Sequence, residues 1–214
     1  MAVLSDGKPG HVKQSKALLS FLEGQGYEIR SKIIEVKFKD RARRAIADVL
    51  AWFSPKNCLS VGRILPFLVD EDTWQKLDRF QADIVVSTGS SAAPLNKLVA
   101  SYLGAKSITI LHPNIPLRSF DLAIIPEHDR LQADNAIAIK GALFYADNVG
   151  EKAKKCEQFF NLSRDKKLSL FLGGPLADGE VFAENLKKFI TKLKEFSLEK
   201  NYKILASTSR RTPK

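Results

Sequence analysis

Residues 5–11 of this chain read SDGKPGH and stand between a short apolar segment and a run with helical periodicity. The apolar segment at residues 2–4 predicts a first strand, and residues 12–23 predict a helix with one apolar face. A glycine turn between a strand and a helix brings backbone N–H groups and the positive end of a helix dipole together, which suits a phosphate. The stretch therefore indicates either a ligand-facing loop, in which His11 donates a proton or a hydrogen bond, or an ordinary turn with a surface histidine.

Short apolar runs go on alternating with helical runs through the first 140 residues. Asp70 or Asp72 is a candidate helix N-cap, and Gly104 is a candidate C-terminal cap. Several of the expected strands are continuous apolar runs, which is typical of a parallel sheet covered on both faces, so the sequence predicts an α/β protein. We expect strands at residues 28–36, 84–86, 107–111, 121–126 and 135–139, and helices at 45–53, 70–80 and 92–103.

Small and polar residues follow four of these strands, at positions 6–11, 87–91, 112–114 and 127–130. In open α/β sheets, ligands bind at the edge formed by the carboxyl ends of the strands. The four loops together therefore predict a site at that edge. Each loop also has a simpler interpretation, as a tight turn or as a charged group that caps a neighbouring helix.

A polar, charged stretch near residues 147–167 precedes a second round of the same pattern. A strand at 168–172, a glycine turn, a helix at 180–196 and a strand at 202–206 indicate a second α/β domain. We expect a first domain at residues 1–150, a linker at 151–166, and the beginning of a second domain at 167–214. Because a domain usually needs at least about 50 residues, we expect the second to be truncated. The alternative is a one-domain protein with a helical extension.

Basic residues outnumber acidic ones by 34 to 24, giving a formal net charge of +10 and a pI near 9.6. Nucleic acid, an anionic membrane surface or a phosphorylated small molecule would each explain this charge. No basic strand is interleaved with base-stacking aromatic residues, so no nucleic-acid partner is expected.

The basic stretch at residues 37–44 leads into an apolar run at 45–53 that ends in Trp52 and Phe53. A basic segment entering a helix with aromatic residues at its end suits a membrane interface. The alternative is a solvated helix face whose apolar side packs in the core.

The two cysteines, Cys58 and Cys156, are far apart and form neither a metal-binding spacing nor a disulfide framework. A reducing cytoplasm is therefore the expected compartment. The three histidines show no zinc-binding pattern, so no metal is expected. No secretory signal is visible, and no run reaches the roughly 18 apolar residues that span a bilayer.

Several motifs occur together and in a fixed order, and through them the chain resembles a known family. It resembles the glycosyltransferases grouped with the Elm mitochondrial-fission proteins, over nearly its whole length. More distantly, the layout is similar to two-domain GT-B glycosyltransferases such as the N-acetylglucosaminyltransferase of peptidoglycan synthesis. The motifs are SDGKPGH at 5–11, STGSSAAP at 87–94, FDL at 120–122, PEHDR at 126–130, LGGP at 172–175 and TSRRTP at 208–213.

The resemblance implies two Rossmann-like domains facing a cleft, with the acceptor on the first and a nucleotide-sugar donor on the second, which is incomplete here. His11 would be the catalytic base or a phosphate contact, and no cofactor beyond the nucleotide-sugar substrate is implied. The turn at residues 140–142 is left outside the site, because its lysine departs from the family pattern. The acceptor cleft would include Asp6, Gly7, Gly10, Thr88, Gly89, Ser90, His112, Glu127 and His128. The donor diphosphate would face Gly173, Gly174, Ser207, Thr208, Ser209, Arg210 and Arg211.

Two hypotheses about function follow. The first is a glycosyltransferase that uses a cell-envelope or lipid-linked acceptor, is cytoplasmic, and lies peripherally on the inner face of an anionic membrane. The second is a non-catalytic, membrane-peripheral interaction protein of the Elm type. On the first hypothesis we expect these 214 residues to be inactive by themselves.

Overall fold

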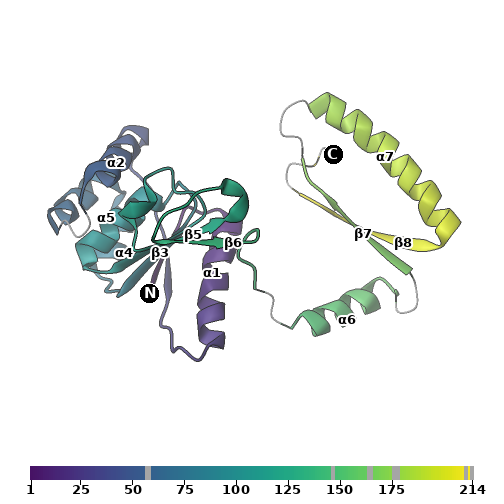
Figure 1. Cartoon of the computed structure of the whole chain (residues 1–214), viewed down its shortest axis with the longest axis horizontal. Coiled ribbons are helices and arrows are strands. Elements are labelled where there is room, and N and C mark those ends of the chain that lie inside the picture. The colour runs from purple at the N-terminus through teal and green to yellow at the C-terminus, as the bar shows by residue number, and fades with distance from the viewer. Residues whose placement is uncertain (56–58, 146–147, 163–165, 175–178, 210–211, 213–214) are drawn as a thin grey trace. The chain divides into compact units, whose positions relative to one another are not determined.

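The computed structural model describes residues 1–55, 59–145, 148–162, 166–174, 179–209 and 212 (Figure 1). The chain divides into two compact units, Met1–Tyr145 and Ala146–Lys214.

The described part of the first unit is built on a six-stranded sheet whose pairings are all parallel. The expected α/β class, with a Rossmann-like parallel sheet, is therefore confirmed. The strands are β1 (Ala2–Ser5), β2 (Lys32–Glu35), β3 (Ile84–Thr88), β4 (Lys106–Ile110), β5 (Leu122–Pro126) and β6 (Ala136–Ile139). The α-helices are α1 (Pro9–Gly24), α2 (Arg41–Phe53), α3 (Leu65–Leu68), α4 (Glu71–Asp78) and α5 (Ala93–Leu103), with short 3₁₀ helices at Leu59–Ile64, Leu117–Ser119 and Glu127–Asp129.

The strand order is β2-β1-β3-β4-β5-β6, so the chain reverses direction across the sheet after β2. β1 pairs with β2 on one side and with β3 on the other. Successive crossovers then leave β1 and β3 toward opposite faces, and a crevice opens between their carboxyl ends. The turn at residues 5–11, which follows β1, lies at this switch point.

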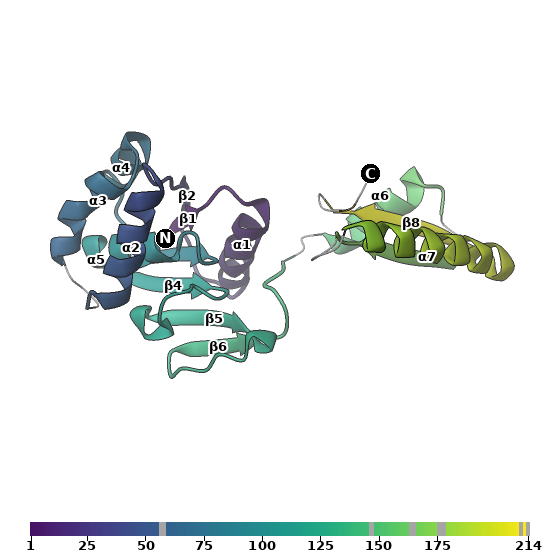
Figure 2. The same ribbon diagram turned by 90° about the horizontal axis from the view of Figure 1, so that it is seen from above.

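Each face of the sheet has its own apolar core, because side chains alternate along a strand. Ala2 and Leu4 face the cluster that includes helices α2–α5, whereas Val3 faces Leu18 and Leu19 of α1. Figure 2 shows α1 apart from the group formed by α2–α5. Phe21 is also within the predicted helix at residues 12–23, where we expected it on the apolar face, but it is 59% exposed.

Two of the expected helix caps are confirmed. The Asp70 side chain accepts a hydrogen bond from the Thr73 backbone N–H at the start of α4. Gly104 ends α5 in the left-handed conformation, with φ +64°. One helix begins earlier than predicted: α2 starts at Arg41, whereas the expected start was residue 45. The reason is an N-cap, because the Asp40 side chain accepts a hydrogen bond from the Arg43 backbone N–H at 2.8 Å.

Helix α2 exposes several of its larger apolar side chains, while Leu50 packs against the core. Its buried residues are Ala47 and Ala51, whereas Val49, Trp52 and Phe53 are exposed. The alternative in which the apolar side of this helix packs in the core is therefore wrong for these three side chains.

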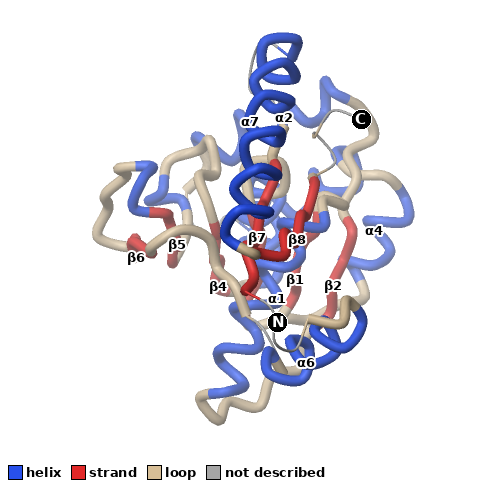
Figure 3. The backbone as a smooth tube through the Cα atoms, turned by 90° about the vertical axis from the view of Figure 1, so that its right-hand side faces the viewer, coloured by secondary structure: helices blue, strands red, loops and turns tan. Residues whose placement is uncertain are grey.

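The second unit contains α6 (Val149–Phe159), β7 (Lys166–Leu172), α7 (Gly179–Lys200) and β8 (Tyr202–Thr208). β7 and β8 pair in parallel along seven residues each, and α7 runs beside them (Figure 3). The predicted linker at residues 151–166 is largely helix α6, which an ion pair between Glu157 and Lys167 ties to β7.

We predict that Gly104→Ala lowers the free energy of unfolding of the first unit by about 1–2 kcal/mol, because an L-residue is strained at positive φ. Open space surrounds the Cβ position of Gly104, so backbone conformation is the cause of the loss. Urea unfolding followed by tryptophan fluorescence measures this unit, which holds Trp52 and Trp74. Gly24→Ala, also in open space but at negative φ near the end of α1, is the matched control and raises stability by up to about 1 kcal/mol. Equal effects of the two substitutions would contradict the assignment of the cap.

Candidate functional site

A hollow of about 490 Å³ lies at the carboxyl edge of the sheet in the first unit. It is lined from the loops that follow β1, β3, β4, β5 and β6, so residues distant in sequence meet here. All three histidines of the chain, His11, His112 and His128, line it. Of the other expected acceptor residues, Gly89 and Ser90 also line the hollow.

His11 and Asp6 form the central pair. The His11 Nδ1 atom lies 3.0 Å from both carboxylate oxygens of Asp6. Because an ionised carboxylate only accepts hydrogen bonds, Nδ1 carries the proton, and the neutral ring then has Nε2 as an acceptor. Among the described residues, none is hydrogen-bonded to Nε2. The pair can therefore take a proton at Nε2 while the carboxylate stabilises the resulting imidazolium.

The Asp6 carboxyl is held in its ionised form. Burial raises its pKa, but hydrogen bonds from the side chain and backbone of Lys8 lower it, as do the charges of His11 and Lys8. The balance places the pKa of Asp6 below its ordinary value of 3.8. The side chain is 9% exposed, so this negative charge is directed at His11 and Lys8 rather than at solvent.

Lys8 joins the two sides of the switch point. Its Nζ atom lies 3.0 Å from an Asp6 carboxylate oxygen and donates to the Ser91 hydroxyl, also at 3.0 Å. The loop after β1 is thereby connected to the loop after β3. Lys8 also lines the hollow and supplies a positive charge there.

The His11 ring lies directly against the backbone of Gly89. A Cβ atom at position 89 would be 2.5 Å from His11 Cε1, and the backbone φ is +77°. Only glycine permits both the conformation and the contact. Gly7, with φ +77°, is also required by conformation, whereas the Cβ position of Gly10 meets open space, so no close approach depends on that residue.

Thr88 has a supporting place and does not line the hollow. It is the last residue of β3, not part of the following loop, and its hydroxyl lies 2.8 Å from the hydroxyl of Ser15 on α1. This buried bond fixes α1, and with it His11, against the sheet.

Two further lining residues carry signs of a ligand site that the sequence pattern does not reveal. Gln14 Oε1 is buried and has no hydrogen-bond partner among the described residues. Leu111 has φ +66°, a strained conformation for a leucine, and directly precedes His112. The turn at residues 140–142 was left outside the site, but Gly141 and Ala142 line the hollow.

Only some residues of the segment after β5 line the hollow. His128 and Asp129 line the hollow, and His128 Nε2 lies 3.6 Å from the Asp129 carboxylate. Glu127, an expected acceptor-cleft residue, is exposed and does not line it. No cluster of His, Cys, Asp or Glu within the described ranges is arranged to hold a metal ion.

Five of the seven expected donor residues are described, and they lie at the carboxyl edge of the second unit. Gly173 and Gly174 follow β7, while Ser207 and Thr208 end β8. The Ser209 N–H donates to the Leu172 carbonyl at 3.1 Å, and the Thr212 hydroxyl lies 3.0 Å from the Gly173 carbonyl. The two strand ends are thus connected. Arg210 and Arg211 lie outside the described residues.

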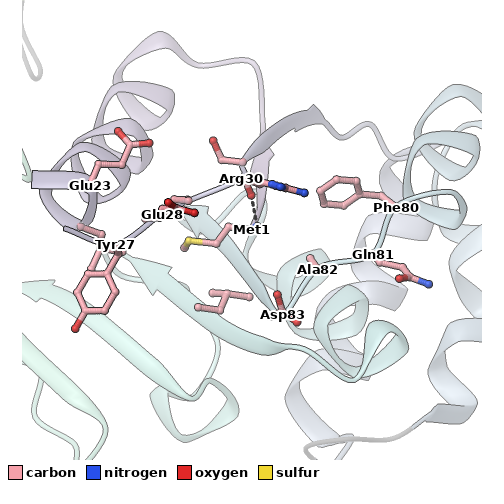
Figure 4. A pocket seen from close by; sticks show the side chains of 13 residues that line it. Met1, Glu23, Tyr27, Glu28, Arg30, Phe80, Gln81, Ala82 and Asp83 are labelled. Carbon is pink, nitrogen blue, oxygen red and sulfur yellow. Dashed lines mark hydrogen bonds between the residues drawn. The ribbon is translucent and has the colours of Figure 1, made fainter. Parts of the chain in front are cut away.

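A larger hollow, of about 1170 Å³, lies at the opposite edge of the same sheet (Figure 4). Met1, Arg30 and Asp83 line it, and the Met1 amino group donates to the Arg30 carbonyl at 2.6 Å. This is the amino-terminal edge of the strands. The carboxyl edge, where parallel α/β sheets bind ligands, is therefore the candidate site despite its smaller volume.

Residues 9–214 match the family model described as Mitochondrial fission ELM1. The chain belongs to this family. The expected resemblance to the Elm group is thereby confirmed, and the candidate site is a feature of an ELM1-family fold. No curated protein and no solved structure matches the chain. Within the described residues, no helix of this ELM1-family chain is long and apolar enough to cross a membrane.

We predict that Gly89→Ala displaces the His11 ring and lowers the free energy of unfolding by about 1–3 kcal/mol, because the new Cβ overlaps His11 Cε1. The imidazole NMR signals of His11 report the displacement. Gly10→Ala, which adds the same methyl group in open space, is the control and leaves those signals unchanged. Unshifted His11 signals in Gly89→Ala would show that the contact is not tight.

The lowered pKa of Asp6 predicts a pH-dependent contribution to stability. Because the folded-state pKa lies below 3.8, the ionised carboxylate stabilises the fold above that pH, and the contribution is lost as pH falls through the folded-state value. Asp6→Asn therefore lowers the free energy of unfolding at neutral pH, and its deficit shrinks in acid. Urea unfolding at stepped pH measures the deficit. Exposed Asp134→Asn is the control, and a deficit of Asp6→Asn that is independent of pH would contradict the ion pair.

Proposed function

We propose that this ELM1-family protein is a GT-B-type glycosyltransferase whose first unit holds the acceptor and whose second unit holds a nucleotide-sugar donor. The observation that carries the proposal is the Asp6–His11 pair, with Nδ1 bound to the carboxylate and Nε2 open, at the switch point of a parallel sheet. An oriented histidine beside a carboxylate is suited to general-base chemistry.

In the proposed reaction, His11 Nε2 takes the proton of an acceptor hydroxyl. The acceptor oxygen then forms a bond to the anomeric carbon of the sugar as that carbon's bond to the nucleoside diphosphate breaks. Asp6 stabilises the imidazolium, and the bonding electrons leave with the diphosphate. Cations and N–H donors must stabilise the negative charge of the departing diphosphate, and we propose this role for Gly173, Gly174 and residues 207–211.

The chemistry of the hollow supports an oxygen-rich acceptor. Gln14 Oε1 is a buried acceptor without a donor, and a ligand hydroxyl would satisfy it. Lys8, His112 and His128 present donors to the same space, which suits a phosphate or a sugar.

A second candidate is a non-catalytic interaction protein that lies on a membrane. The exposed apolar side chains of α2, including Phe53 at 78% exposed, favour it. The family description is also compatible with that role.

Transfer assays with a panel of nucleotide sugars test the first proposal. We expect His11→Gln to reduce the transfer rate by about 10²–10⁴-fold, while calorimetric binding of the donor stays unchanged. Lys13→Gln, an exposed change on the same helix, is the control and keeps the parent rate. A His11→Gln protein that transfers at the parent rate, or a parent protein that binds no nucleotide sugar, would overturn the proposal.

A further inference from the structure

A groove of about 280 Å³ runs beside helix α2 in the first unit. Val49, Trp52 and Phe53 line it from the helix, and Ile115 and Asn114 line it from the loop after β4. The groove is thus built from elements that also position the candidate site.

The groove lies next to the hollow that holds His11. Ser90 lines both spaces, on the loop between β3 and α5. A ligand in the hollow would therefore have the groove on the other side of Ser90.

The apolar side chains of the groove have no partner that explains them within the described residues. Val49 is 57% exposed, Trp52 49% and Phe53 78%, while the same helix buries only the small Ala47 and Ala51. A helix that turns its large apolar residues to solvent marks a binding surface for apolar material.

The polar and charged residues near the groove indicate which head group an apolar ligand would carry. Lys8 and three histidines surround the hollow at one end. Arg44 and Asp48 line the groove itself, and burial raises the pKa of Asp48 above its ordinary value although the charge of Arg44 opposes the shift. Asp129 also lines the hollow, and Lys8 is the cation there. Lys8 and the ring N–H groups of the histidines can donate to an anionic head group, and the aromatic lining of the groove suits a hydrocarbon chain.

We propose that this groove binds the hydrocarbon chain of a phosphate-bearing lipid whose head group lies in the hollow beside His11. The identity of the head group as the acceptor rests on the function proposed above; the chain-binding groove itself does not. The groove holds the first part of a chain, and the remainder passes over the exposed face of α2.

The fluorescence of Trp52 tests the proposal. Trp74 is the chain's other tryptophan and packs against Tyr102, so Trp74→Phe leaves Trp52 as the reporter. Monomeric farnesyl phosphate is expected to change the Trp52 emission saturably, whereas inorganic phosphate at equal concentration does not. In the same background, Phe53→Ser weakens farnesyl phosphate binding, measured by calorimetry, by about tenfold or more.

The matched control is Phe159→Ser on helix α6, which removes an equally exposed phenylalanine, 82% exposed, from the second unit. It leaves the affinity unchanged. Circular dichroism of both variants confirms that they are folded.

Equal affinity of Phe53→Ser and the parent would overturn the groove, as would an equal response to inorganic phosphate. Binding to phosphatidylglycerol vesicles without binding of monomeric farnesyl phosphate would replace it with a membrane-docking face, and a Phe53-dependent dimer in sedimentation would replace it with self-association. Chain binding without sugar transfer would contradict the proposed function alone. Transfer to a soluble acceptor without chain binding would contradict the groove alone.

Discussion

Parallel pairing of β1 on both of its sides is the constraint on which the rest of the first unit depends. β1 is only four residues long, yet it is hydrogen-bonded to β2 and to β3 and is buried throughout. This double pairing places the end of β1 beside the end of β3. The contact of His11 with Gly89, the bridge from Lys8 to Ser91 and the bond between Ser15 and Thr88 all follow from that placement.

In the candidate site, burial and neighbouring charges have opposite effects on the pKa of Asp6. Asp6 is nearly buried, which by itself disfavours its ionised form, and the surrounding donors and cations reverse that tendency. The same carboxylate then orients His11 and Lys8. Removing any one of these three groups leaves the others with an incomplete set of partners, so the cluster acts as a unit.

Helix α2 departs from the usual arrangement of an amphipathic helix on a sheet. It contacts the core through Ala47, Ala51 and the partly buried Leu50, and its aromatic residues are exposed beside the candidate site. The stability that burial of these aromatics would supply is absent from this unit. That arrangement is consistent with a surface kept for an apolar ligand or partner.

The local pattern was sufficient to predict the α/β class, a helix cap at Asp70 or Asp72, the cap at Gly104 and the polar loops at strand ends, because periodicity and capping depend on neighbours in sequence. The structure selects Asp70. Parallel strands also made it predictable that those loops would meet, as His11, Gly89, His112 and His128 do. Other features depend on contacts between distant segments, which no local pattern encodes.

Thr88 ends a strand and does not line the hollow, Gly141 lines it, and α2 exposes Val49, Trp52 and Phe53. Each of these results follows from register and packing across the sheet. The sequence by itself therefore determined which residues could do chemistry at the carboxyl edge. Only the tertiary structure decided which of them share one space, because the order of the strands, not the order of the residues, sets that proximity.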